Sequence, residues 1–296
     1  EAGKTLYDAI AELREAVDFL RYYAAQARHH VSTKGADIPR GVFGCISPWN
    51  FPLAITLGQI SAALAAGNAV LAKPAETTNL VAGFACKILH EAGVPRSALQ
   101  VLPGAGAEIG AAIAGLEGLA GLCFTGSTAT AQRIAQTMAP TAQVDAPLIA
   151  ETGGLNAMIV DSTALPEQAV RDIITSAFRS NGQRCSALRM LYVQEDCAEP
   201  VLTMLKGAMD MLRSGDPWQL DTDIGPAITA EAARDIRAYV AQAEKEGRLL
   251  KRLEGGASGA FTPPAMIRVA GIDALECHSG IFLGFGTIAL LERVFW

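Results

Sequence analysis

Several features that would define the class of a protein are scarce in this sequence. Aromatic residues make up 6% of the 296 positions and charged residues 18%, and there are only four histidines and six cysteines. The cysteines are scattered and no two form a CxxC pair, which argues against a disulfide framework and a zinc site. We therefore expect free thiols, a reducing cytoplasmic compartment and no bound metal.

An excess of positive charge is also absent. The 24 Lys and Arg residues against 30 Asp and Glu give a net charge of −6, which argues against nucleic acid as a partner. The first residues lack the apolar core of a signal peptide. The stretch 51–72 is uncharged and long enough to cross a bilayer, but polar residues and glycines interrupt it. We predict a buried helix and strand there, and no transmembrane segment.

Hydrophobic residues and glycine are abundant. Half of the chain is hydrophobic and 29 positions are glycine, a composition that excludes a disordered chain because it can bury a large core. A chain of about 300 residues is near the upper limit for a single core, so two domains are expected.

Short apolar runs alternate with amphipathic segments through the first half of the chain. After an expected helix at 4–30, this alternation predicts an α/β fold whose parallel sheet has both faces covered by helices. The expected strands are 42–46, 69–72, 99–102, 119–124 and 148–150, and the expected helices are 53–66, 78–91, 107–114 and 128–138.

A second α/β block follows Gly153 and Gly154. The segment 281–291 is apolar and interrupted by glycine, so it is either a pair of strands or sequence that does not belong to the fold. The expected strands are 157–160 and 188–193, and the expected helices are 167–180, 200–212 and 230–246.

Two glycine-containing turns are candidates for binding a phosphate group. Gly104, Gly106 and Gly110 follow a strand, but their GxGxxxG spacing differs from the GxGxxG dinucleotide fingerprint. They either bind a pyrophosphate or form a tight turn near a cofactor. Gly126 and Ser127 also join a strand to a helix, where backbone amides can bind an anion. The alternative is an ordinary serine N-cap.

Other strand ends carry polar side chains. The rigid segment Ser47-Pro48-Trp49-Asn50-Phe51-Pro52 presents the amide of Asn50, which either stabilises an oxyanion or bonds to its own loop. Lys73 and Glu76 either hold ribose hydroxyls or form a solvated pair.

Two further residues have the chemistry of a catalytic pair. Glu151 is a carboxylate at the end of a strand, next to Gly153 and Gly154. Cys185 is either a thiolate nucleophile in a polar loop or a small buried side chain.

Together, and in this order, the segments SPWNFP, KPAE, FTGS, ETGG and QRCS resemble the aldehyde dehydrogenase superfamily. The spacings agree as well, with 23 residues from Asn50 to Lys73 and 34 from Glu151 to Cys185. The sequence around these motifs, such as LIAETGG and GQRCSALR, is similar to that of one branch of the superfamily, the L-glutamate γ-semialdehyde (Δ1-pyrroline-5-carboxylate) dehydrogenases. Within that branch it is most similar to the dehydrogenase domain of bifunctional proline utilization A proteins.

The resemblance implies a mechanism for the conversion of a small aldehyde to an acid. Cys185 would attack the aldehyde, while the Asn50 amide and the Cys185 N–H stabilise the oxyanion. Glu151 would then act as the general base for hydrolysis of the thioester. Ser186 and Phe51 would contact the substrate, glutamate γ-semialdehyde.

The resemblance also implies NAD as the cofactor. Lys73 and Glu76 would hold the adenosine ribose, and Ser127 with the following helix start would bind the pyrophosphate. The other expected cofactor contacts are Ser47, Pro48, Trp49, Gly106, Gly110, Phe124, Gly126 and Gly153.

Some positions depart from the family pattern. Leu155 stands where the branch usually has a polar residue after ETGG. The family's E-x-F-G-P motif and oligomerisation segment have no clear counterpart, although family members are oligomeric. We therefore expect a chain truncated at both ends, or disrupted in frame after Glu276. A non-catalytic nucleotide-binding remnant, another aldehyde dehydrogenase branch and a misfolding fragment are the alternatives.

These considerations predict three regions. Residues 1–153 are expected to form a Rossmann-type NAD-binding domain, residues 154–276 a partial catalytic domain and residues 277–296 a divergent tail. Whether a proline dehydrogenase domain precedes Glu1 is left open.

Overall fold

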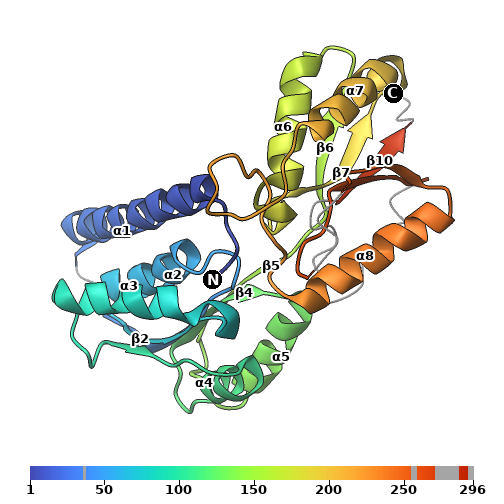
Figure 1. Cartoon of the computed structure of the whole chain (residues 1–296). Helices are drawn as coiled ribbons and strands as arrows, with labels where there is room; N and C mark the ends of the chain where they lie inside the picture. Colours follow the sequence, from blue (N-terminus) through green and yellow to red (C-terminus); the bar gives the residue numbers. More distant parts are fainter. Residues whose placement is uncertain (36–37, 255–258, 271–286, 293–296) are drawn as a thin grey trace. The chain divides into compact units, whose positions relative to one another are not determined.

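The computed structural model describes residues 1–35, 38–254, 259–270 and 287–292 (Figure 1). Its contacts divide the chain into two compact units. Unit 1 comprises residues 1–2 and 9–152, and unit 2 comprises residues 3–8 and 153–296. The short segment 3–8 thus belongs to unit 2, although it precedes most of unit 1 in the sequence.

Unit 1 contains a five-stranded sheet in which all neighbouring strands are parallel. The strand order is β3-β2-β1-β4-β5. The strands are β1 (Val42–Ile46), β2 (Ala69–Lys73), β3 (Leu99–Val101), β4 (Gly121–Gly126) and β5 (Leu148–Thr152).

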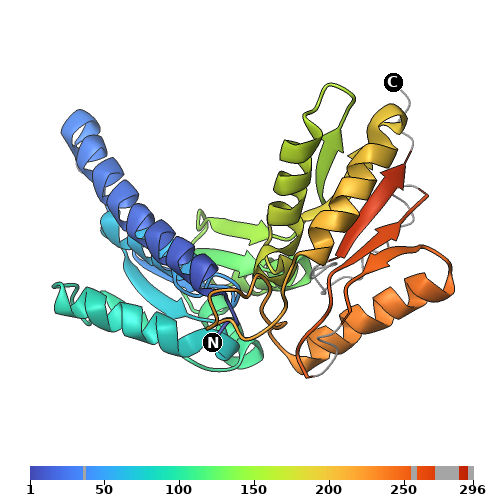
Figure 2. The ribbon, with the colours of Figure 1, turned by 45° about the horizontal axis from the view of Figure 1, so that its top comes forward.

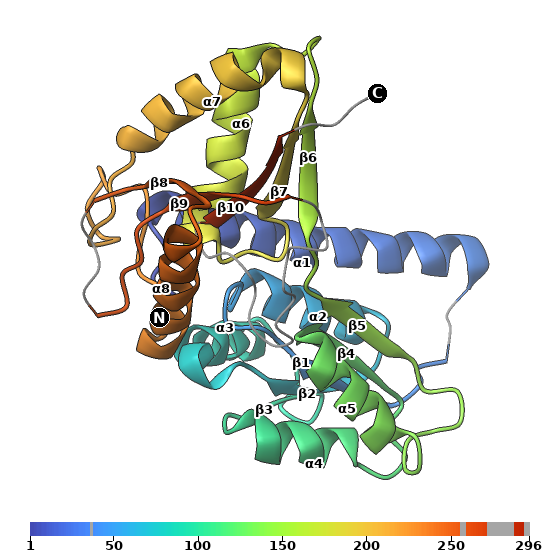
Figure 3. The same cartoon turned by 90° about the vertical axis from the view of Figure 1, so that its right-hand side faces the viewer.

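Helices cover both faces of this sheet (Figures 1 and 3). Alternate residues of β1 point to opposite faces, so Phe43 and Cys45 pack with Ile60 of α2, whereas Ile46 packs with Ile113 of α4. Burial on both faces explains why the central strands β1 and β4 are mostly apolar. The helices are α1 (Leu6–Lys34), α2 (Ala54–Ala65), α3 (Asn79–Glu91), α4 (Ala111–Ala114) and α5 (Thr128–Met138).

Unit 2 contains a second five-stranded sheet, with the order β6-β7-β10-β9-β8. Only the β8–β9 pair is antiparallel among its described neighbours. The strands are β6 (Asn156–Val160), β7 (Leu188–Val193), β8 (Leu249–Arg252), β9 (Ala265–Arg268) and β10 (Thr287–Glu292).

Three longer helices pack on the second sheet. Figure 2 shows α6 (Pro166–Phe178) and α7 (Glu195–Asp210) on one side of it, and α8 (Ala230–Lys245) on the other. Ile173 and Leu205, from α6 and α7, share a buried cluster with Leu191 of β7. This cluster anchors the start of β7, which immediately follows the loop that carries Cys185.

The structure confirms the predicted α/β class with parallel sheets. Several helix boundaries were predicted wrongly, and the largest difference is at α7, which begins at Glu195, not at Pro200. A proline usually marks the first turn of a helix, but here it lies inside one, where burial of Val201 and Leu205 offsets the missing backbone hydrogen bond. Strands β8 and β9 were not predicted, and β10 lies in the segment for which two interpretations were left open. Among the described residues, every helix is too short or too polar to cross a bilayer.

Candidate active site

The carboxyl ends of four neighbouring strands in unit 1 carry most of the predicted site residues. Lys73 pairs with Ile46, which also pairs with Phe124, so the ends of β2, β1 and β4 lie level with one another. Thr125 pairs with Glu151, which adds the end of β5 to the same row. The sheet therefore brings four of the predicted turns of unit 1 together at one edge.

The strand order reverses at this edge. From β1 the sheet continues through β2 and β3 on one side and through β4 and β5 on the other. In open parallel sheets, ligands bind outside the carboxyl ends of the strands at such a reversal. The reversal here lies between β1 and β4, hence between the loop that starts at Ser47 and the turn at Gly126 and Ser127.

Hydrogen bonds fix the start of the loop after β1. The Ser47 N–H donates to the carbonyl oxygen of Lys73 at 3.1 Å, which ties this loop to the end of β2. The Thr56 hydroxyl donates to Ser47 Oγ at 2.7 Å. Ser47 and Pro48 are buried, whereas Trp49 and Phe51 are half-buried.

A buried carboxylate fixes the other end of this loop. Glu12 Oε1 accepts the N–H groups of Leu53 and Ala54, at 2.8 and 3.1 Å. These groups begin α2, where a negative charge is favourable because the helix dipole is positive there. The neighbouring Asn50 is only 6% exposed, so this residue is buried. Loop conformation here does not depend on the loop sequence alone.

Lys73 is a buried ammonium group with spare hydrogen-bonding capacity. It is 3% exposed, and Nζ donates to the carbonyl oxygen of Pro74 at 3.0 Å. Burial lowers the pKa of Lys73, while the Glu76 carboxylate raises it. An ammonium has three donors, and this is its one hydrogen bond among the described residues. Two donors beside an exposed carboxylate fit a ligand with neighbouring hydroxyls, such as a ribose.

The turn between β4 and α5 has the geometry of an anion site. Ser127 is the N-cap of α5, and its Oγ accepts the N–H of Thr130 at 3.2 Å. The N-cap interpretation of this serine is therefore correct, and it is compatible with phosphate binding because the first helical N–H groups stay open. A Cβ on Gly126 would lie 2.5 Å from the Phe124 ring, which explains glycine there.

The glycines after β3 serve different purposes. Gly104 has a φ of 149°, and a Cβ there would approach Ile109 to 2.7 Å, so it is needed for a tight turn. At Gly106 a Cβ would meet no atom of the described residues within 4 Å. At Gly110 it would lie 3.8 Å from Lys73 Cδ, which places this glycine against the buried lysine.

Glu151 lies on the exposed edge strand β5. Its side chain is exposed, and within the described part of the chain no group bonds to its carboxylate. Gly153, two residues later, is exposed as well. The carboxylate is therefore accessible to water.

In unit 2, the loop before β7 that carries Cys185 contains a left-handed turn. Ser180, Asn181 and Gly182 have φ values of 54°, 53° and 65°, and the first two are the only non-glycine residues with positive φ in the described ranges. Each such residue other than glycine costs about 1–2 kcal/mol. Cys185 follows this turn, is half-buried, and its carbonyl oxygen accepts Asn156 Nδ2 at 2.5 Å.

Side chains distant in the sequence hold the first residue of this turn. Asp8 Oδ2 accepts both the N–H and the hydroxyl of Ser180, at 3.0 and 2.8 Å. Its other oxygen, Oδ1, accepts Nε and Nη2 of Arg179, at 3.0 and 2.5 Å. The guanidinium of Arg179 also lies 4.1 Å from the centre of the Tyr7 ring. All four carboxylate contacts thus converge on the start of the left-handed turn.

Two further hydrogen bonds hold the rest of the turn. Asn181 is fully buried, and its Nδ2 donates to Thr262 Oγ1 at 3.1 Å. Arg189 Nη2 donates to the carbonyl oxygen of Gly182 at 2.6 Å. Each residue of the left-handed turn therefore has its own partner from outside it.

Cationic groups surround Cys185. The pKa of Arg189 is lowered to about 10, mainly by burial and also by the charge of Arg184, while the interaction with Cys185 opposes this shift. Burial also lowers the pKa of Arg184, on which Cys185 acts in the opposite sense.

Other described cysteines lack such surroundings. Burial raises the pKa of Cys86 to about 11, so this thiol stays protonated at neutral pH. A hydrogen bond between the thiols of Cys45 and Cys123 raises the pKa of Cys45 and lowers that of Cys123. Cys277 lies outside the described residues. Cys185 thus differs from these cysteines in lying in a loop beside Arg184 and Arg189.

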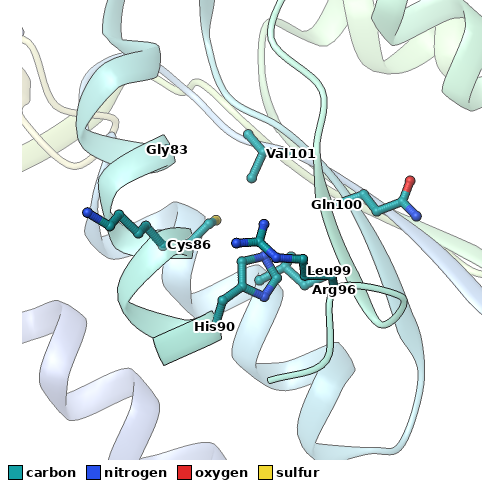
Figure 4. Close-up of a pocket in the computed structure, with 8 residues that line it drawn as sticks. Gly83, Cys86, His90, Arg96, Leu99, Gln100 and Val101 are labelled. Atoms are coloured by element: carbon teal, nitrogen blue, oxygen red, sulfur yellow. The ribbon is translucent and has the colours of Figure 1, made fainter. Parts of the chain in front are cut away.

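Cys86 forms part of a groove of about 500 Å³ between α3 and β3 (Figure 4). The close-up shows that the side chains of His90 and Arg96 line this groove. None of the predicted site residues lines it. Its lining residues are Gly83, Cys86, Lys87, His90, Arg96, Leu99, Gln100 and Val101.

Comparisons with known proteins identify the family. The profile of the "Aldehyde dehydrogenase family" matches residues 1–282. The chain belongs to the aldehyde dehydrogenase family. The fold predicted from the family resemblance is therefore confirmed.

Within the aldehyde dehydrogenase family, the chain is similar to two kinds of relative. The chain is 51% identical over 288 residues to the "Bifunctional protein PutA" of Klebsiella aerogenes, covering 93% of this chain and 22% of that protein. It is 38% identical over 297 residues to the "1-pyrroline-5-carboxylate dehydrogenase" of Geobacillus sp. (strain WCH70), covering 95% and 58%.

A solved structure of a PutA protein is also similar to this chain. The D779Y mutant of Bradyrhizobium japonicum proline utilization A (PutA) has a TM-score of 0.92 and 46% identity, with 98% of this chain and 31% of that one covered. The chain thus spans about a fifth to three fifths of the length of these aldehyde dehydrogenase relatives.

The structure of this aldehyde dehydrogenase family member also identifies residues that the sequence analysis missed. Asp8, Asn156 and Arg189 hold the loop of Cys185. The adjacent Asn181 and Gly182 could have indicated the turn, because Asn-Gly tolerates left-handed backbone. Nothing in the sequence relates Asp8 to a residue 172 positions away.

Proposed function

We propose that this chain carries the cofactor-binding and nucleophile-bearing parts of an NAD-dependent dehydrogenase that oxidises L-glutamate γ-semialdehyde to L-glutamate. The observation that carries the proposal is the loop of Cys185. This half-buried cysteine lies beside Arg184 and Arg189. Hydrogen bonds with Asp8, Arg189 and Asn156 hold the loop in place. The names of the relatives, which include 1-pyrroline-5-carboxylate dehydrogenase, support the choice of substrate.

In this proposal, Cys185 attacks the aldehyde carbon and forms a thiohemiacetal. The amide of Asn50 and the N–H of Cys185 donate hydrogen bonds to the resulting oxyanion, and loss of one such donor typically costs about 3–4 kcal/mol of transition-state stabilisation. Ser186 and Phe51 contact the rest of the substrate.

NAD, when bound, accepts the hydride that converts the thiohemiacetal to a thioester. Glu151 then removes a proton from water, the water attacks the thioester, and the products are glutamate and the free Cys185 thiol. Exposure of the Glu151 carboxylate supports this role, because the group must reach water.

The row of strand ends in unit 1 supports NAD as the cofactor. Lys73 and Glu76 hold the hydroxyls of the adenosine ribose, and the carboxylate of Glu76 disfavours the additional phosphate of NADP. Ser127 and the first N–H groups of α5 bind the pyrophosphate. Glycine at 106, 110 and 126 keeps this edge open, with Ser47, Pro48, Trp49, Phe124 and Gly153 as the remaining contacts.

The deciding experiment measures NADH production by the 296-residue chain with glutamate γ-semialdehyde. We expect turnover with NAD, weaker turnover with NADP, and a loss of at least about a thousandfold in Cys185→Ala, since nothing replaces the nucleophile. Cys86→Ala is the matched control, because that thiol is buried and protonated.

Two results would contradict the proposal. Turnover that survives Cys185→Ala would exclude this nucleophile. Calorimetric binding of NAD without any turnover would favour a non-catalytic nucleotide-binding chain.

A further inference from the structure

The left-handed turn before Cys185 is kept in place by side chains rather than by its own sequence. Ser180 is the one position of the turn that is neither glycine nor asparagine, the residues that tolerate this conformation best. It is also the position at which a buried carboxylate bonds to both the N–H and the side chain. The contacts are concentrated where the backbone is least favourable.

We propose that Asp8 is a positioning residue for the nucleophile, acting by holding Ser180 in its left-handed conformation. This inference rests on the proposed role of Cys185. Asp8 lies in the segment 3–8 of unit 2, is 7% exposed, and does not touch Cys185 itself.

A chain of backbone hydrogen bonds connects Ser180 to the nucleophile. The Ser180 carbonyl accepts the N–H of Gln183 at 2.9 Å, and the Gly182 carbonyl accepts the N–H of Arg184 at 2.9 Å. Gln183 also bonds through its side chain to the carbonyl of Pro226 and the N–H of Ile228, at 3.0 and 2.7 Å.

The short chain of bonds makes the position of Cys185 depend on Ser180. If Ser180 turned to a right-handed conformation, its carbonyl would point elsewhere and the bond to Gln183 would be lost. The sulfur of Cys185, two residues later, would move with it. A misplacement of about 1 Å in a reacting group can cost a hundredfold in rate.

The first test is Asp8→Ala, with Asp18→Ala as the matched control. Asp18 is an exposed carboxylate on the same helix, α1. We expect Asp8→Ala to lower kcat about tenfold to a hundredfold, with KM for NAD close to that of Asp18→Ala. A kcat equal to that of Asp18→Ala would overturn the proposal.

The second test separates conformational control from ion pairing. Glycine adopts left-handed backbone without strain, so Ser180→Gly should restore most of the kcat of Asp8→Ala. If the loss instead came from leaving Arg179 unpaired, Arg179→Ala would restore it and Ser180→Gly would not. That second pattern would contradict a positioning role through Ser180.

A third readout does not require turnover. Hydrogen exchange of the peptide 179–187 reports the N–H groups of Gln183 and Arg184 directly. We expect exchange at least about tenfold faster in Asp8→Ala than in Asp18→Ala, and restored protection with Ser180→Gly. Unchanged exchange would refute the proposal even in a chain without activity.

These readouts distinguish failure of this inference from failure of the proposed function. Turnover that survives Cys185→Ala would remove the proposed function, whereas the exchange measurement would still decide whether Asp8 holds the loop. Should Asp8→Ala not fold, Asp8→Asn keeps the side-chain volume and removes the charge, and the same comparison with Ser180→Gly applies.

Discussion

The candidate cofactor edge of unit 1 and the cysteine loop of unit 2 use the backbone in opposite ways. At the cofactor edge, each turn follows a regular parallel strand, and the polar groups it offers come from strand ends and a helix start. In the cysteine loop, two non-glycine residues have left-handed backbone, and partners from elsewhere in unit 2 hold them.

The difference indicates which substitutions each region tolerates. A site built from regular backbone is sensitive to added volume, because the backbone keeps its shape when a side chain is removed. A site held by side chains is sensitive to removal of those side chains, even where they do not touch the reacting atoms. Three stability measurements test this contrast.

The largest effect on stability is expected for Arg189→Met. The substitution leaves the carbonyl oxygens of Gly182 and Arg184 without a buried charged donor, at a cost of about 2–3 kcal/mol. Arg171→Met is the control, because this arginine on α6 is exposed and its ion pair with Asp172 contributes at most about 1 kcal/mol. Urea unfolding measures both, and equal losses would remove the distinction between the two regions.

A smaller effect is expected for Gly126→Ala at the cofactor edge. Its Cβ would lie 2.5 Å from the buried Phe124 ring, and such overpacking costs about 1–3 kcal/mol. Gly106→Ala is the matched control, because its Cβ would meet no atom within 4 Å in the described part of the chain. Urea unfolding should show a loss in Gly126→Ala alone. If Gly106→Ala lost as much stability, added volume would not be the cause.

The smallest effect concerns the alkaline stability of unit 1. The thiol of Cys86 has a pKa of about 11 in the folded chain against an ordinary value of 9.0. Between these values the unfolded chain has lost the proton and the folded chain keeps it, so the free energy of unfolding decreases as pH rises from about 9 to 11. Cys86→Ala should show a shallower decrease in urea unfolding across this range. Parallel curves would contradict the assignment.

The regular elements were predictable because their signals are local. Strand β1, strand β7 and helix α5 were predicted to the residue, since each apolar or amphipathic run is bounded by polar residues or glycine, and Ser127 provides a cap. The start of α7 was not, because a proline that normally begins a helix lies inside this one.

The candidate site was predictable only in part, for a physical reason. The signal of a strand-end site lies in neighbouring residues of the sequence. Lys73, Ser127 and Glu151 could therefore be proposed as site residues from the segments that contain them. The helical period of α6 predicted a helix as far as Ser180, but α6 ends at Phe178 and the left-handed turn follows. That turn depends on Asp8, whose contact with Ser180 has no local signal.

The position of Asp8 in the sequence has a consequence for synthesis of the chain. Asp8 leaves the ribosome 172 residues before Ser180, and at about 5–20 residues per second this interval is roughly 9–34 s. By then all five strands of unit 1, which end at Thr152, have been synthesised. The Asp8 carboxylate therefore stays hydrated, without its partners Arg179 and Ser180, during the period in which the first sheet can already form.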